Sequence, residues 1–104
     1  GTELERTARR ILAKAFDASS RKFIDAIAQA LPAQPREEIE WRYHFMLGAM
    51  FYTMANSGRI QSLTEGRCDP GDVGMALHHM IPFLAAGFRS APVSDPANKK
   101  EERR

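Results

Sequence analysis

The segment 39–55 constrains the fold of this chain more than any other part of the sequence. Successive residues of a helix lie about 100° apart, and this spacing gathers the apolar side chains of the segment on two separate faces. The first, here called the methionine face, carries Tyr43, Met46, Leu47, Met50, Phe51 and Met54. The second, here called the aromatic face, carries Trp41, Phe45, Gly48, Ala49 and Tyr52. A surface helix of a small monomer normally has one apolar stripe, so this helix needs two packing partners.

Two arrangements would cover both faces. In a monomeric bundle, the aromatic face packs inside the same core, whereas in a dimer it meets a second copy of the chain. Gly48 and Ala49 lie at the middle of the aromatic face and are flanked by large rings. Small residues let two backbones approach closely, and aromatic side chains bury much of the area of an interface. The pattern therefore favours a homodimer.

Composition limits the classes of protein to which the chain can belong. Its 104 residues suffice for one domain with a modest core. A formal net charge of +2 is too small to indicate nucleic-acid binding by this chain. The single cysteine, Cys68, excludes an internal disulfide. With no apolar run of about 18 residues and no signal-peptide pattern, we expect no membrane span and a cytoplasmic location.

The apolar periodicity predicts an all-α fold. We expect an antiparallel bundle of three main helices at about 3–31, 36–56 and 70–90. The first helix keeps its register through residues 17–20 and ends before Pro32. Residues 1–91 would form the folded domain, and residues 92–104 a disordered tail.

Three further local features are expected. The stretch 58–68 lacks sustained periodicity but has room for a short helical turn. Asp69 before Pro70 is typical of a helix start, because a carboxylate caps the first turn and proline suits the first helical position. Pro82 falls inside the third main helix, where we expect a kink because its nitrogen has no hydrogen to donate.

The sequence offers little catalytic or metal-binding chemistry. The histidines are His44, His78 and His79, and adjacent histidines point about 100° apart on a helix, which does not suit a shared metal. No cysteine or serine has an identifiable base, and the glutamates 37–40 are explained by the start of a helix. We expect no enzyme activity, no metal and no cofactor. The methionine face suits either an adaptable core or the wall of a cavity for a small apolar effector.

Three segments together resemble the C-terminal half of regulators of the tetracycline-repressor family: ALPAQPREEIEWRYHFMLGAMFYTMA, GRCDP and ALHHMIPFLAAGFRS. The resemblance covers residues 16–89. It implies an all-α domain that binds a small effector and dimerises through a four-helix bundle built from the last two long helices of each subunit. The implied dimer interface consists of Trp41, Phe45, Gly48, Ala49, Tyr52, His79, Pro82, Phe83 and Ala86. The implied effector pocket is the methionine face.

The chain departs from that family in one respect. The family's DNA-reading helices precede the part that is matched, and residues 1–15 are too few for a helix-turn-helix. We therefore expect this chain to be a fragment of a regulator, with DNA binding in another portion. Our hypothesis is an effector-sensing and dimerisation domain, in which a ligand between the first and second helices changes the spacing of two DNA-reading heads. The alternative is a stand-alone helical adaptor whose aromatic face docks a different protein.

Overall fold

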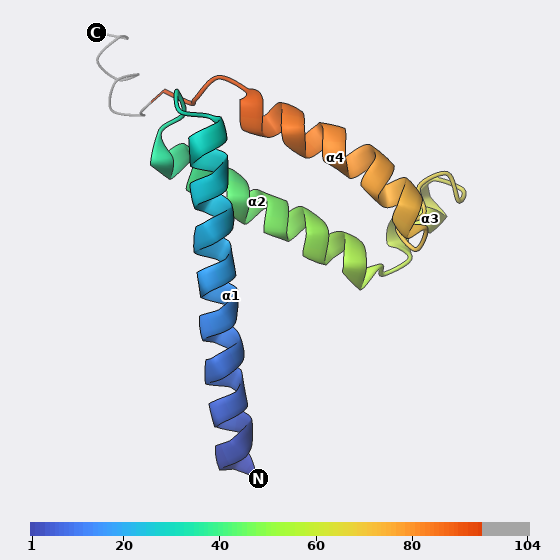
Figure 1. Cartoon of the computed structure of the whole chain (residues 1–104). Coiled ribbons are helices and arrows are strands. Elements are labelled where there is room, and N and C mark those ends of the chain that lie inside the picture. The colour runs from blue at the N-terminus through green and yellow to red at the C-terminus, as the bar shows by residue number, and fades with distance from the viewer. Residues whose placement is uncertain (95–104) are drawn as a thin grey trace, which may run out of the picture.

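A computed structural model describes residues 1–94, and over this range every regular element is a helix. The elements in chain order are α1 (Thr2–Ala30), α2 (Arg36–Ala55), α3 (Arg59–Leu63) and α4 (Val73–Arg89). The second half of α1 crosses α2, and α4 returns along α2 in the opposite direction (Figure 1). Helix α2 packs against both long neighbours, whereas α1 and α4 do not pack against each other in the described part. The predicted all-α class is confirmed.

Most helix ends lie where the sequence places them. Helix α1 is uninterrupted through residues 17–20, and α2 ends at Asn56, whose left-handed backbone (φ 39°) stops the helix. The expected turn within 58–68 is α3, and α4 continues through Pro82. The predicted tail falls largely on residues 95–104, which lie outside the described part.

The predicted start of the last helix near residue 70 is wrong by about one turn. Helix α4 begins at Val73, because the carboxylate of Asp72 accepts a hydrogen bond from the Met75 amide (3.1 Å) and caps the helix. Asp69 instead accepts a hydrogen bond from the Gly71 amide (2.9 Å) and closes a turn before the helix. Two aspartates three residues apart offer two alternative caps, and here the second one is used.

The second half of α1 packs on the Tyr43 side of α2. The hydroxyl groups of Tyr43 and Ser20 are 2.6 Å apart, and the rings of Tyr43 and Phe23 lie 5.6 Å apart between centroids. Nearby on α2, Ile39 and Met46 are the two most buried side chains, with exposed fractions of 1% and 9%. Tyr43 of the methionine face therefore packs against α1, whereas Met50 of the same face is exposed.

Arg42 joins the C-terminal end of α4 to α2. Its guanidinium donates hydrogen bonds to the carbonyl groups of Phe88 (2.8 Å), Ser90 (2.9 Å) and Ala91 (3.0 Å). The same group pairs with Glu38 at 3.1 Å, and the two side chains are 10% and 19% exposed. The last carbonyl groups of a helix have no partner within it and carry partial negative charge, so a cation there is well placed. Gln34 reinforces the joint by donating to the Ser90 carbonyl at 2.7 Å.

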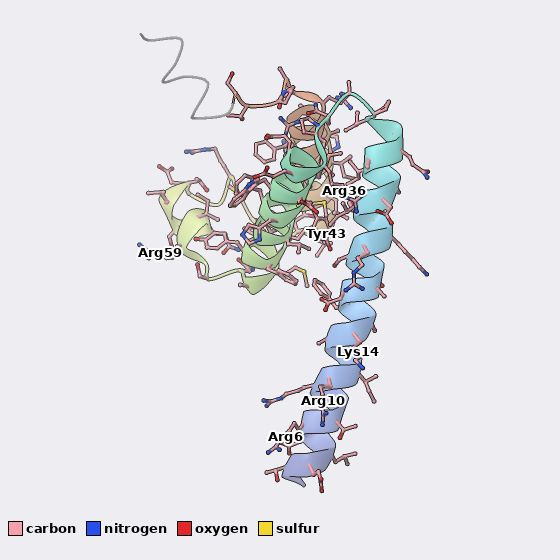
Figure 2. All side chains as sticks on the ribbon, turned by 90° about the vertical axis from the view of Figure 1, so that its left-hand side faces the viewer. Arg6, Arg10, Lys14, Arg36, Tyr43 and Arg59 are labelled. Atoms are coloured by element: carbon pink, nitrogen blue, oxygen red, sulfur yellow. The ribbon has the colours of Figure 1, made fainter. Side chains whose placement is uncertain are left out.

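The described helices do not enclose a core of the usual size. The radius of gyration is 18.3 Å, whereas a compact chain of this length has about 13 Å. The first half of α1, which carries Arg6, Arg10 and Lys14, stands away from the other helices (Figure 2). Many large apolar side chains therefore remain exposed, among them Leu4, Ile11, Trp41, Phe45, Tyr52, Met54 and Phe83. Within residues 1–94, no other segment covers these side chains.

The Arg42 joint predicts a measurable loss of stability. Replacing Arg42 by methionine removes three bonds to helix-end carbonyl groups and leaves Glu38 without its cation. We expect the free energy of unfolding to fall by roughly 2–4 kcal/mol, given the usual cost of charged hydrogen bonds in a shielded site. Chemical denaturation followed by circular dichroism, at a fixed protein concentration, measures it.

Arg36→Met is the matched control. Arg36 pairs with Asp25 (2.6 Å) and more loosely with Glu40 (3.8 Å), but all three side chains are more than half exposed. Its loss should cost less than about 1 kcal/mol, because exposed ion pairs contribute little. Equal effects from the two substitutions would contradict the role assigned to Arg42.

Candidate functional site

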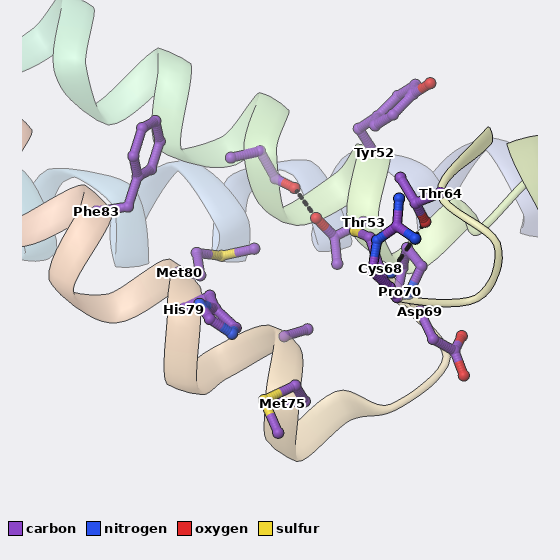
Figure 3. Close-up of a pocket in the computed structure, with 13 residues that line it drawn as sticks. Tyr52, Thr53, Thr64, Cys68, Asp69, Pro70, Met75, His79, Met80 and Phe83 are labelled. Atoms are coloured by element: carbon purple, nitrogen blue, oxygen red, sulfur yellow. Dashed lines mark hydrogen bonds between the residues drawn. The ribbon is translucent and has the colours of Figure 1, made fainter. Parts of the chain in front are cut away.

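A groove of about 670 Å³ opens between the second half of α2, the loop after α3, and α4. Its volume lies within the range of pockets that hold small molecules. Figure 3 shows Tyr52 and Thr53 on α2, and Met75, His79, Met80 and Phe83 along α4. The complete lining is Ala49, Tyr52, Thr53, Thr64, Arg67, Cys68, Asp69, Pro70, Met75, Ala76, His79, Met80 and Phe83.

The loop wall of the groove is shaped by backbone geometry. Glu65 and Gly66 adopt left-handed conformations with φ of 54° and 83°. The Gly66 amide donates to the Gln61 carbonyl at 2.8 Å, which turns the chain away from α3. A side chain at Gly66 would be strained, because residues other than glycine rarely adopt this region. The turn directs the following loop back over the end of α2.

The threonine hydroxyl groups of the groove already have backbone partners. Thr53 donates to the Ala49 carbonyl at 2.7 Å, and Thr64 donates to the Ile60 carbonyl at 2.7 Å. The Thr64 oxygen also accepts a hydrogen bond from the Cys68 amide at 3.0 Å. The two threonines therefore offer little polar capacity to a ligand. Among residues 1–94, the groove side chains without any such bond include Tyr52, Arg67 and His79.

The methionine face lies elsewhere on α2. None of its six residues lines the groove. Tyr43 contacts Ser20 of α1, Met46 is buried, and Leu47 is half-buried. Met50, Phe51 and Met54 are exposed. An effector site between the first two helices therefore stays a prediction, and the groove is a second candidate on the opposite side of α2.

The aromatic face of α2 is uncovered. Trp41, Phe45 and Tyr52 are all exposed, and a side chain added at Gly48 would meet no atom within 4 Å. The rings of Trp41 and Phe45 lie 5.9 Å apart, so they form one apolar strip along the helix. On α4, Phe83 is 72% exposed, and His79, Pro82 and Ala86 are exposed as well.

The groove and the predicted dimer interface share residues. Ala49 and Tyr52 on α2, and His79 and Phe83 on α4, belong to both. Of the remaining interface residues, Trp41, Phe45, Gly48 and Ala86 lie toward the other end of the α2–α4 pair, and Pro82 lies between His79 and Phe83. The groove thus adjoins one end of the predicted interface.

Sequence reasoning missed the groove because its loop wall has no periodic pattern. The residues 64–70 are positioned by backbone bonds and left-handed turns, which leave only Gly66 as a sequence signal.

The histidines form no cluster with other metal-binding side chains. The rings of His78 and His79 are 5.4 Å apart and nearly perpendicular. Over residues 1–94, no three histidine, cysteine, aspartate or glutamate side chains converge on a common point. In the same range, no helix has both the length and the apolar character needed to cross a membrane. Cys68 is exposed and carries a free thiol.

Comparison with known proteins identifies the family. The family model described as "Tetracyclin repressor-like, C-terminal domain" matches residues 2–87, which span α1 to α3 and nearly all of α4. No curated protein and no solved structure gives a significant match. The resemblance found in the segments of α2 and α4 is confirmed by this match. The chain therefore belongs to the family of tetracycline repressor-like C-terminal domains.

Proposed function

We propose that this chain is the effector-sensing and dimerisation domain of a tetracycline repressor-like transcriptional regulator. The observation that carries the proposal is the uncovered aromatic face of α2, which continues into the groove beside α4. Family membership supports the same role. In such a regulator, contacts with DNA would be made by a portion other than the residues described here.

The exposed surface supports a second copy of the chain as the cover. The chain exposes 8718 Å², whereas a compact monomer of its mass exposes roughly 5,900 Å². The excess of roughly 2,800 Å² is larger than the approximately 800 Å² that each partner buries in a standard interface. A two-fold pairing through α2 and α4 would bury the aromatic face against its own copy.

Helix α2 has the local features that such a pairing needs. Gly48 lies between Phe45 and Tyr52 on the aromatic face, so two copies of α2 can approach closely at that point. Because α4 runs antiparallel beside α2, two copies would form a four-helix bundle.

The groove supports the effector-sensing part of the proposal. It is bounded by two helices that are joined firmly by Arg42 at the opposite end of α4. A ligand that binds one spacing of α2 and α4 better than another would shift the population toward that spacing. In a dimer, the shift would reach the second subunit because α2 and α4 form the interface.

Gly48→Leu tests the interface. Light scattering coupled to size-exclusion chromatography should give twice the chain mass of 11.7 kDa for the wild type. A β-carbon at residue 48 meets no other part of the described chain within 4 Å, and leucine improves helix propensity, but it would overpack the centre of the dimer. We expect the variant to be a folded monomer, with helix content checked by circular dichroism.

Gly87→Leu is the matched control for the interface. Gly87 is also helical, also has no atom within 4 Å of an added side chain, and lies outside the predicted interface. It should stay dimeric. A wild-type chain that is monomeric at high micromolar concentration would contradict the proposal and favour an adaptor that docks a different protein.

Ala76→Phe tests the groove as an effector site. Ala76 is half-buried in the groove, so a phenyl ring there would fill part of it. We expect 1-decanol, or members of a panel of apolar metabolites, to raise the melting temperature of the wild type, because a ligand that binds the native state stabilises it. The variant should lose this rise. Ala8→Phe, on the exposed first half of α1, should keep it. A wild type that shows no rise with any compound would contradict an effector role.

A further inference from the structure

We propose that the groove selects an amphipathic carboxylate, a molecule with an apolar body and a single anionic group. The inference rests on the proposed role of the groove as an effector site and adds the chemical class of the ligand. It follows from which groove side chains are already satisfied and which are not.

The floor and sides of the groove are apolar. Met75, Met80 and Phe83 on α4, Ala49 on α2 and Pro70 in the loop all line it. The threonines add no free hydroxyl hydrogen, since both donate to carbonyl groups of their own helices. Methionine side chains adapt to ligands of different outline. An aliphatic or aromatic body therefore suits this part of the groove.

Arg67 supplies the charge that an anionic group would need. It lines the groove, and none of the ion pairs within residues 1–94 includes it. The negative charge of the lining is Asp69, which accepts hydrogen bonds from the Gly71 amide and the Gln61 side chain. In Figure 3, the carboxylate of Asp69 points away from Met80 and Phe83. A ligand anion would therefore meet Arg67 without facing Asp69 across the apolar floor.

The donor set fits a carboxylate better than a phosphate. One guanidinium can bind one carboxylate with two parallel hydrogen bonds. His79, also on the lining, has a ring N–H that can donate a further hydrogen bond to the carboxylate. A doubly charged phosphate would need a second cation. Among residues 1–94, the lining holds no lysine and no arginine besides Arg67. The amino end of α4, which would otherwise attract an anion, is capped by Asp72.

Isothermal titration calorimetry with decanoate and 1-decanol separates charge from apolar contact. The two probes share the same chain and differ in the head group. We expect decanoate to bind the wild type roughly tenfold more tightly than 1-decanol, as one charge-assisted pair would give. Arg67→Gln should lower the affinity for decanoate roughly tenfold and leave that for 1-decanol unchanged.

Arg10→Gln provides the matched control. Arg10 lies on the first half of α1, away from the groove, so its loss should change neither affinity. The inference is overturned if 1-decanol binds the wild type as tightly as decanoate, or if Arg67→Gln and Arg10→Gln act alike. Binding of 1-decanol without a preference for decanoate rejects the carboxylate class while the proposed function stands. Failure of both probes to bind rejects the inference, and the mass of the chain in solution then tests dimerisation separately.

Discussion

The position of α4 depends on the hydrogen bonds of Arg42. Helix α4 does not pack against α1, so its placement comes from α2 and from the loops at its two ends. At the C-terminal end of α4, the shielded guanidinium of Arg42 binds the carbonyl groups of Phe88, Ser90 and Ala91. These three bonds fix the distance and the direction of α4 relative to α2. At the N-terminal end of α4, the loop 64–70 and the groove separate α4 from α2. The α2–α4 pair is thus joined at one end and open at the other.

Under the proposed function, this asymmetry places ligand binding and dimerisation on one surface. Tyr52 and Phe83 belong both to the groove and to the predicted interface, so under the proposed function a change at one must be felt at the other. Linkage is reciprocal: a ligand that strengthens the dimer is bound more tightly by the dimer, by the same factor. No long path through the protein is then needed to carry the effect of the ligand to the second subunit.

Helices whose apolar side chains recur at regular spacing can be predicted from the sequence. Contacts made by backbone groups cannot, because they leave no pattern of side chains. Periodicity located the three long helices and the side of α2 that meets α1, because Tyr43 and Phe23 stand on complementary apolar stripes. The role of Arg42 has no periodic signal in the sequence, because its partners are carbonyl groups 46 to 49 residues away. The groove was missed for the same reason: Thr64 and Gly66 act through hydrogen bonds and turns. Two possible caps, Asp69 and Asp72, could not be ranked without the turn between them.

The first half of α1, like α2, carries exposed apolar side chains. Leu4 and Ile11 are seven residues apart and lie on one side of the helix, but Phe23, which packs on α2, lies about 120° further round. Leu12 and Phe16 lie within about 20° of Phe23, so part of the apolar surface of the first half continues the side that packs on α2, whereas Leu4 and Ile11 form a second side. Both Leu4 and Ile11 are more than half exposed. Helix α1 thus resembles α2, because each presents one apolar side to a neighbouring helix and a second apolar side that the rest of residues 1–94 leaves exposed.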